Sequence, residues 1–397
     1  MKALVVSALY PPRQVGGAEK IAQVVTEGLA AAGHDCVVLT TMPGWGAQRS
    51  RVNGIDVHSI GLRNLYWPHE RRDRMFPAKP LWHALERYNP LMGRQVARIL
   101  DSERPDVVHT HSLTGFSCAA WHEVKARGIP LVHTLHDYSL MCPRTSMFQD
   151  GRNCDGQCRT CAAFTGPARR ISARVDAVVG VSRFTLERHL ASGYFGATAR
   201  REVILNAIAA PRAAVARDER TARPLRLGYV GQLVPAKGVR VLVEQMRAWS
   251  PQQCRLVVAG SGARDYEDLL REGVGPNVRM LGFVDPRQVY ESIDVLVVPS
   301  LWEEPLGMIV LEAYMQGVPV IAAHRGGLPE IVDHGVTGLL YEPGQPQALH
   351  DAIDGLVRHR GRLDALRAGA LAKASAFLGT RMQAQYAALV ATVATAA

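Results

Sequence analysis

The feature that most constrains the fold is an alternation of short apolar runs with stretches of helical spacing. The run Ala3–Ala8 stops before Pro11, and apolar residues then recur at helical intervals from Ala18 until Gly33, which is placed as a C-terminal cap. Strands that alternate with helices predict a parallel sheet covered on both faces. Further strands of this sheet are expected at Cys36–Thr41, Asp106–Thr110, Leu131–Leu135 and Ala177–Val181.

The same alternation restarts after about residue 210, so the sequence predicts an α/β protein with two Rossmann-like, doubly wound domains. The segment Ala209–Arg223 lacks periodicity and is taken as the linker. We expect one domain over 1–207, including a Cys-rich loop at 142–161, and a second over 208–377. A closing helix over 378–397 could pack back on the first domain. Because ligands bind at the carboxyl edge of parallel strands, two facing domains predict a cleft.

Length and hydropathy fit this two-domain prediction. The chain has 397 residues, of which 47% are hydrophobic and 21% are charged, as in ordinary globular proteins. No apolar run reaches the roughly 18 residues that a membrane-spanning helix needs. The first apolar run ends at Pro11 and is too short for a signal peptide, so a cytoplasmic location is expected.

The positive charge is concentrated in the first half of the chain. Residues 1–205 carry 26 Lys and Arg against 17 Asp and Glu, whereas residues 206–397 carry 20 against 19. The densest stretch, Arg49–Arg98, is interleaved with aromatic residues: Tyr66, Trp67, Phe76, Trp82 and Tyr88. Such a surface suits an anionic membrane, here the inner face of the plasma membrane, or a lipid-linked acceptor. A solvated Arg-rich loop is the alternative, and nucleic acid is not expected because no matching motif accompanies the charge.

The strongest chemical constellation runs from Ser300 to Ala313. It places Glu304 before a helix and Glu312 about two turns inside it, with seven residues between the two carboxylates. The backbone N–H groups near Gly307–Ile309 would lie at the helix N-terminus, which attracts anions such as a diphosphate. The carboxylates could accept hydrogen bonds from sugar hydroxyls. The alternative is an acidic first turn that only complements the helix dipole.

This stretch resembles the E-x7-E motif of glycosyltransferase family 4, a large retaining family with the GT-B fold. Other segments resemble that family in the same order along about 320 residues, and together they are highly specific. These segments are 10–12, 16–19, 181–182, 231–238, 259–262, 281–283, 317–322 and 326–330. The resemblance implies a GT-B architecture in which the second domain binds a nucleotide-sugar.

The resemblance also implies roles for individual residues. His136, Lys237 and Glu304 would be catalytic: His136 contacts the donor sugar and helps to position the acceptor, Lys237 stabilises the departing diphosphate, and Glu304 binds a sugar hydroxyl. Glu312 would bind the ribose. The implied donor-binding set is Gly16, Gly17, Gln232, Lys237, Gly260, Phe283, Val284, Glu304, Leu306, Gly307, Met308, Ile309 and Glu312.

Two positions depart from the family pattern, and two further histidines are weaker candidates. Gln232 stands where members often have Arg, so the phosphate clamp would depend more on Lys237. Ala207 stands where the family has Gly after Asn, which makes a positive φ there unfavourable. His109 and His111 end the strand before that of His136, and each is read either as a site residue or as a satisfied polar group.

The implied function is a retaining glycosyltransferase of the hexosyltransferase type (EC 2.4). It would transfer a sugar from a UDP- or GDP-linked donor to a glycan or lipid-linked acceptor in cell-surface polysaccharide or glycolipid synthesis, without a catalytic metal. A membrane-docked binding module without turnover and a GT-B epimerase are the alternatives. The sequence shows no recognisable pyridoxal-binding lysine, which a phosphorylase would need. It also has no Gly-x-Gly-x-x-Gly after the first strand, which a dehydrogenase would need.

Four of the seven cysteines form a cluster in the order Cys142, Cys154, Cys158 and Cys161. Four thiolates at this spacing suit a structural Zn²⁺ site, and an iron–sulfur cluster would use the same ligands. Reduced thiols or disulfides in a surface loop are the alternative, although cytosolic proteins rarely keep disulfides. The cluster follows the segment of His136, so any metal there would shape a loop rather than take part in catalysis.

Overall fold

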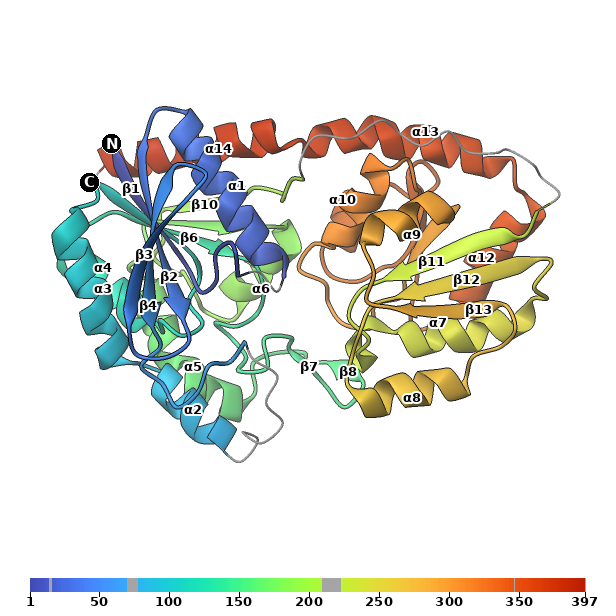
Figure 1. Ribbon diagram of the computed structural model, residues 1–397, viewed down its shortest axis with the longest axis horizontal. Coiled ribbons are helices and arrows are strands. Elements are labelled where there is room, and N and C mark those ends of the chain that lie inside the picture. Colours follow the sequence, from blue (N-terminus) through green and yellow to red (C-terminus); the bar gives the residue numbers. More distant parts are fainter. Residues whose placement is uncertain (14–15, 70–77, 209–222, 346, 397) are drawn as a thin grey trace. The chain divides into compact units, whose positions relative to one another are not determined.

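The computed structural model describes residues 1–13, 16–69, 78–208, 223–345 and 347–396, and it divides into two compact units. The first unit comprises Met1–Met147, Cys154–Asn206 and Gly379–Ala397, and the second comprises Phe148–Asn153 and Ala207–Leu378. Each unit is built on its own sheet with helices on both faces (Figure 1). The predicted linker Ala209–Arg223 lies, apart from its last residue, outside the described residues.

The sheet of the first unit has the order β10-β9-β6-β5-β1-β2-β4-β3 and is parallel apart from the antiparallel pair β3–β4. Its interior strands are largely buried, as expected where helices cover both faces, although β5 and β6 also bury histidines and threonines. The bounds are β1 (Lys2–Ser7), β2 (Asp35–Met42), β3 (Ala47–Val52), β4 (Ile55–Gly61), β5 (Val107–Ser112), β6 (Leu131–Leu135), β9 (Ala177–Gly180) and β10 (Arg200–Val203).

The helices of the first unit are α1 (Gly17–Ala31), α2 (Lys79–Glu86), α3 (Pro90–Glu103), α4 (Ala119–Ala126), α5 (Arg159–Ser172), α6 (Arg183–Ala191) and α14 (Gly379–Thr395). The closing helix α14 packs beside α1, where the side chain of Gln383 donates to the carbonyl of Val24 at 2.9 Å. It also buries Tyr386 against the sheet, so the end of the chain completes the core of the first unit.

The second unit has a six-stranded, fully parallel sheet of order β13-β12-β11-β14-β15-β16 and a short hairpin. The strands are β11 (Leu225–Val230), β12 (Cys254–Ala259), β13 (Val278–Gly282), β14 (Val295–Val298), β15 (Val320–Ala323) and β16 (Gly338–Tyr341), and the hairpin is β7 (Phe148–Gln149) with β8 (Arg152–Asn153). The helices are α7 (Val239–Gln245), α8 (Arg264–Glu272), α9 (Pro286–Ser292), α10 (Met308–Met315), α11 (Leu328–Ile331), α12 (Ala348–Arg358) and α13 (Arg362–Ala374). Short 3-10 turns are η2 (Pro235–Lys237), η3 (Met246–Ala248) and η4 (Ser375–Phe377).

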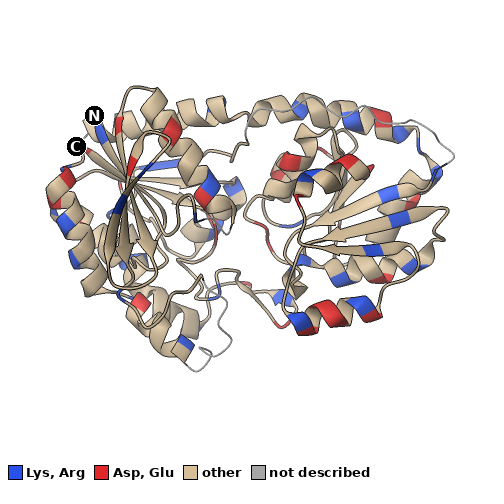
Figure 2. Ribbon diagram, in the orientation of Figure 1, with Lys and Arg blue, Asp and Glu red and all other residues tan. Residues whose placement is uncertain are grey.

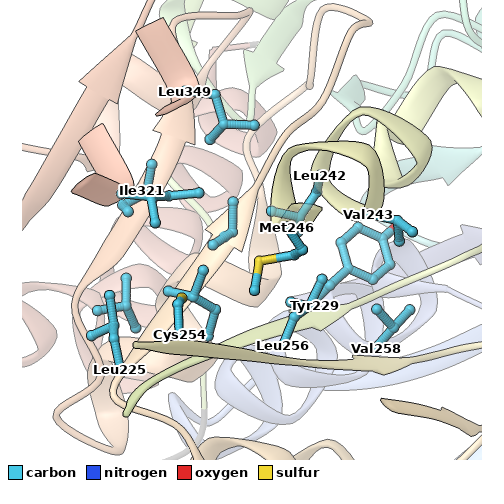
Figure 3. Packing of buried hydrophobic residues seen from close by; sticks show 14 of the residues in the cluster. Leu225, Tyr229, Leu242, Val243, Met246, Cys254, Leu256, Val258, Ile321 and Leu349 are labelled. Atoms are coloured by element: carbon cyan, nitrogen blue, oxygen red, sulfur yellow. The ribbon is translucent and has the colours of Figure 1, made fainter. Parts of the chain in front are cut away.

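Apolar side chains from the sheet and the flanking helices form the core of the second unit. Figure 3 shows Leu242 and Met246 above Leu256, with Ile321 and Leu349 completing the cluster from neighbouring elements. Burying such side chains contributes the main favourable free energy of folding. Charged residues gather instead on solvent-facing helices such as α8, which carries both signs along its length (Figure 2).

The strands expected from the sequence are present, with ends shifted by one or two residues. The sequence did not indicate the antiparallel edge pair β3–β4, because β3 is exposed along its length and has no apolar alternation. Gly33 has φ 87° just after the C-cap of α1, as predicted for a helix-ending glycine. Ala207 has no positive φ, so the backbone there does not need the glycine of the family pattern.

Candidate active site

The predicted donor residues of the second unit gather at the carboxyl edge of its sheet. Gln232 and Lys237 follow β11, Gly260 follows β12, and Glu304 follows β14, which neighbours β11. Parallel strands bring their carboxyl ends to one edge, so residues far apart in sequence converge there. Figure 1 shows β11 and β12 side by side.

Lys237 and Glu304 form the centre of this edge. The Lys237 ammonium lies 2.7 Å from Oε1 of Glu304, and the Ser300 hydroxyl donates to the same oxygen at 2.5 Å. Glu304 is buried, whereas about a quarter of the Lys237 side chain (26%) is exposed. The Lys237 ammonium nitrogen lies 4.9 Å from the centre of the Trp302 ring. The carboxylate is therefore held by charge and hydrogen bonding, while the lysine stays accessible to an anion.

Glu312 lies in α10 and is held by a tyrosine from another helix. The Tyr290 hydroxyl, from α9, donates to Oε2 of Glu312 at 3.0 Å. Burial, and then the charge of Glu312, raise the pKa of Tyr290 well above its usual value, so this tyrosine stays a donor. The sequence placed Glu312 about two turns inside the helix; this is wrong, because α10 begins only at Met308 and Glu312 is its fifth residue.

Gly307 sets the start of α10. It is the N-cap and has φ 103°, a region that favours glycine, and an added Cβ would lie 2.6 Å from Cδ2 of Leu328. The next residues, Met308 and Ile309, supply first-turn N–H groups, which have no acceptor within a helix. Leu306 is buried and fixes the approach to this turn.

Gly260 lets two strand ends approach closely. Its φ is 146°, and a Cβ added there would lie 1.8 Å from the carbonyl oxygen of Gly231, at the end of the neighbouring strand. Gln232, the residue after Gly231, is exposed, and its carbonyl accepts from the Tyr229 hydroxyl at 2.7 Å. Phe283 is 86% exposed and Val284 is half-buried at the end of β13, and their predicted contacts with a base stay a prediction.

In the first unit, Gly16 and Gly17 stand at the start of α1, the helix that comes after β1 in the chain. Gly16 is the N-cap, and its N–H donates to Oε2 of Glu19 at 3.0 Å. The glycine loop is therefore ordered as a helix start from Gly16 onward. Its predicted role at the donor phosphates stays a prediction.

The predicted His136 is half-buried and follows β6, next to the buried His109 and His111 of β5. Its Nε2 lies 2.9 Å from Nδ1 of His111, and the His111 ring lies 4.2 Å from that of His109. Burial lowers the pKa of His136 to about 4 and that of His109 to about 3, so both rings are neutral near pH 7. Tyr386 of α14 covers this group, with its ring 5.4 Å from that of His109.

The four clustered cysteines are free thiols, and they interact electrostatically with one another. Cys142 is buried, Cys154 and Cys161 are half-buried, and Cys158 is exposed, where it caps α5 by accepting from the Cys161 N–H at 3.4 Å. Burial, followed by interaction with Cys158 and Cys142, raises the pKa of Cys161. Within the described ranges, no three His, Cys, Asp or Glu side chains are arranged to hold a metal ion, so the structural zinc stays a prediction.

Several site residues escaped the sequence reasoning. Ser300 lies within the recognised constellation but received no role, whereas Tyr290 belongs to another helix and no local spacing points to it.

Trp82, counted among the aromatic residues of a basic surface, is buried at 4% exposure, and Phe76 lies outside the described residues. None of the helices that the structure describes is long and apolar enough to cross a membrane.

Comparisons with known proteins match both halves of the chain to glycosyltransferase families. Residues 16–207 match the family described as glycosyl transferase 4-like domain, and residues 224–359 match glycosyl transferases group 1. The D-inositol 3-phosphate glycosyltransferase of Xylanimonas cellulosilytica is 31% identical over 297 residues, covering 68% of each chain. An uncharacterized glycosyltransferase, MJ1607 of Methanocaldococcus jannaschii, is 28% identical over 378 residues, covering 89% of this chain and 88% of its own.

The solved structures agree on the fold. The crystal structure of Anabaena Alr3699/HepE in complex with UDP and glucose has a TM-score of 0.72 at 20% identity, and the match covers 98% of this chain and 99% of that one. The predicted GT-B architecture of two Rossmann-like domains is thereby confirmed. With the matching families and relatives, these findings show that the chain is a glycosyltransferase (EC 2.4) and belongs to the group 1 glycosyltransferases, of the family 4 type.

Proposed function

We propose that this glycosyltransferase is retaining and transfers a sugar from a UDP- or GDP-linked donor to a glycan or lipid-linked acceptor. The observation that carries the proposal is the contact of Lys237 with the buried carboxylate of Glu304, at the sheet edge that also bears the start of α10. A cation, a carboxylate and a helix N-terminus within one unit offer partners for a diphosphate and for sugar hydroxyls. The UDP and glucose of the Anabaena complex support a nucleotide-sugar donor.

In the proposed reaction, the protein contributes positioning and charge. The bond between the anomeric carbon and the diphosphate oxygen breaks, and the acceptor oxygen bonds to that carbon on the same face. The acceptor proton passes to the departing diphosphate oxygen. Lys237 and the first N–H groups of α10 would stabilise the diphosphate, and Glu304 would hold a sugar hydroxyl. Glu312, oriented by Tyr290, would accept from the ribose hydroxyls.

His136 would contact the donor sugar and help to position the acceptor. Its ring touches that of His111, and the low pKa keeps it neutral, so it can donate or accept a hydrogen bond without carrying charge. This role agrees with a mechanism in which no protein side chain takes the acceptor proton.

The first test is a thermal-shift panel with UDP, GDP and ADP at about 1 mM, since only ligands that bind the native state stabilise it. We expect one diphosphate to raise the Tm well above the others and so to identify the base. NMR of the product, made with the matching sugar donor, should show the anomeric configuration of that donor. A shift with no turnover on any acceptor would favour the binding module, and an inverted product would refute retention.

We further propose that α2 helps to place the enzyme on an anionic membrane, where lipid-linked acceptors occur. Leu81 and Leu85 lie four residues apart on this helix and are 57% and 41% exposed, and Trp45 of the same unit is 72% exposed. Lys79 begins the same helix. Basic and apolar residues together are typical of helices that bind anionic lipid surfaces.

Sedimentation with phosphatidylglycerol vesicles tests the membrane proposal. The double variant Leu81→Ser/Leu85→Ser should bind less than the wild-type protein, whereas Leu269→Ser, an exposed leucine of the second unit, should bind equally. Equal binding by all three proteins, or equal binding to neutral phosphatidylcholine vesicles, would refute it.

A further inference from the structure

The hairpin of β7 and β8 belongs to the second unit, although the chain on both sides of it belongs to the first. Its last residue, Asn153, uses both ends of its side-chain amide on one loop of that unit. The Nδ2 group donates to the carbonyl of Leu301 at 2.8 Å, and Oδ1 accepts from the N–H of Glu303 at 2.9 Å. One side chain thus joins two backbone groups that flank Trp302, as a neighbouring strand would.

The loop that Asn153 holds carries the centre of the active site. Trp302 lies beneath the Lys237 ammonium, and Glu304 pairs with it. Other bonds fix the ends of this loop: the Leu301 N–H donates to the carbonyl of Ala236, and the carbonyl of Glu304 accepts from Gly327. Between these points the Trp302 N–H donates to the same Ala236 carbonyl, and the Glu303 carboxylate accepts from the Gly326 N–H. The two bonds from Asn153 add the Leu301 carbonyl and the Glu303 N–H to this network.

The chemistry at position 153 calls for an asparagine. The loop presents one acceptor, the Leu301 carbonyl, and one donor, the Glu303 N–H, so a matching side chain must offer one of each. An aspartate could accept but not donate, and its charge would face the Leu301 carbonyl. An alanine would do neither. The half-buried Asn153 matches this loop because its amide both donates and accepts a hydrogen bond.

We propose that Asn153 is a positioning residue for the donor site: it holds the loop 301–303 so that Lys237 and Glu304 keep the geometry that binds the donor. Asn153 acts through the loop, because its amide bonds backbone groups of Leu301 and Glu303 and not the side chains of Lys237 or Glu304. The effect of Asn153 on donor binding rests on the proposed function. Its effect on the loop 301–303 does not depend on that function.

Hydrogen exchange of the free protein, followed by mass spectrometry, tests the effect on the loop. In Asn153→Ala and Asn153→Asp, peptides spanning residues 301–304 should exchange about two- to tenfold faster, because single hydrogen bonds contribute modestly. Gln149→Ala is the matched control, since Gln149 is an exposed residue of the same hairpin. Unchanged exchange in both Asn153 variants would overturn the proposal, whether or not the wild-type protein binds a nucleotide.

Steady-state kinetics test the effect on the donor. Asn153→Asp should raise the KM for the donor about three- to tenfold, or lower kcat, with an unchanged KM for the acceptor and an unchanged Tm. In a Lys237→Ala background the same change should have a smaller effect, because both changes disturb the same interaction of Lys237 with the donor. Equal donor KM and equal kcat values for Asn153→Asp and Gln149→Ala would overturn the role. If the wild-type protein binds no nucleoside diphosphate, the proposed function fails, and the exchange result still decides whether Asn153 holds the loop.

Discussion

The Lys237 ammonium and the Glu304 carboxylate lie 2.7 Å apart, so the residues predicted to hold the diphosphate and the sugar of the donor are partners of each other. A diphosphate that approaches Lys237 therefore competes with a buried carboxylate that already has a second donor, the Ser300 hydroxyl. Ser300 can keep Glu304 in place while Lys237 turns toward the ligand. The pair is thus suited to exchange partners when a donor binds.

Replacing Lys237 with Ala should lower kcat by about 10²–10³, because charge stabilisation of a leaving group is typically a contribution of this size. Steady-state kinetics with the donor identified in the thermal-shift panel will measure it. The Tm should change little, since the side chain is partly exposed and Ser300 still donates to Glu304. Arg240 follows closely in the chain but pairs with Glu244, so we do not expect it to replace the lost charge. Near-normal turnover would refute the assignment.

Removing the hydroxyl of Tyr290 should weaken donor binding without stopping the reaction. Tyr290→Phe leaves the packing of α9 intact but deletes the 3.0 Å hydrogen bond to Glu312, so the donor Kd should rise about three- to tenfold with little change in kcat. Calorimetric titration with the nucleoside diphosphate measures this. Tyr314→Phe is the matched control, because its hydroxyl is also buried but bonds Thr337. Equal affinities in the two variants would contradict a ribose-binding Glu312.

The sequence predicted those parts of the site that follow directly from strand ends. Lys237 and Glu304 each follow a buried strand, and the parallel topology brings these ends together without further information. The start of α10 was also predictable, since Gly307 precedes an apolar helical stretch. The depth of Glu312 was misjudged, because a helix that starts at Met308 has Glu312 as its fifth residue, about one turn inside rather than two.

The parts that escaped prediction depend on contacts between distant segments. Asn153 and Glu303 are 150 residues apart, and no periodicity relates a residue of a Cys-rich loop to a loop after β14. Tyr290 meets Glu312 only because α9 and α10 pack beside each other. Similarly, Trp82 reads as a surface aromatic in a basic stretch, and only the packing of α2 shows that it is buried.

The four clustered cysteines make a separate prediction about metal. We propose that rotation of the four side chains lets them bind one Zn²⁺, because thiolates at this spacing are typical zinc ligands and Cys161 already interacts with Cys158 and Cys142. Elemental analysis of protein purified without chelators should find about one equivalent of zinc. Cys161→Ser should lose it, whereas Cys254→Ser, a buried cysteine of the other unit, should not. Less than about a tenth of an equivalent in the wild-type protein would contradict the site.

The buried carboxylate of Asp294 predicts a large effect on stability. It is fully buried and pairs with Arg226, Arg223 and Arg367 at 3.0 to 3.2 Å. Burial alone would raise its pKa, but hydrogen bonds and charge from Arg226 outweigh burial and lower it. Asp294→Asn should reduce the free energy of unfolding of the second unit by about 3–5 kcal/mol, since it leaves the arginines without their shared anion.

Urea unfolding measures this effect, and Asp364 offers a matched control. Asp364 pairs with the same Arg367 at 3.0 Å but is 63% exposed in its side chain, so Asp364→Asn should cost less than about 1 kcal/mol. Similar urea midpoints for the two variants would show that the buried cluster contributes no more than a surface pair.

The buried histidines of the first unit predict a loss of stability in acid. Burial lowers the pKa of His109 to about 3 and of His136 to about 4, below the value of about 6.5 for an unfolded chain. Between these limits the unfolded state binds more protons than the folded state, so the free energy of unfolding falls as pH decreases from about 6.5 to about 4. Above about pH 6.5 both states are neutral at these positions, and this contribution is constant.

Each such histidine contributes a slope of up to about 1.4 kcal/mol per pH unit within that window. The variant His109→Gln can keep a hydrogen bond to Thr134, which His109 contacts at 2.9 Å, and removes one titrating group. Its unfolding free energy, measured with urea at a series of pH values, should depend less steeply on pH than that of the wild-type protein. His122→Gln is the control, because His122 is exposed and should leave the slope unchanged. A wild-type slope retained in His109→Gln would mean that His109 does not sense pH in the folded unit.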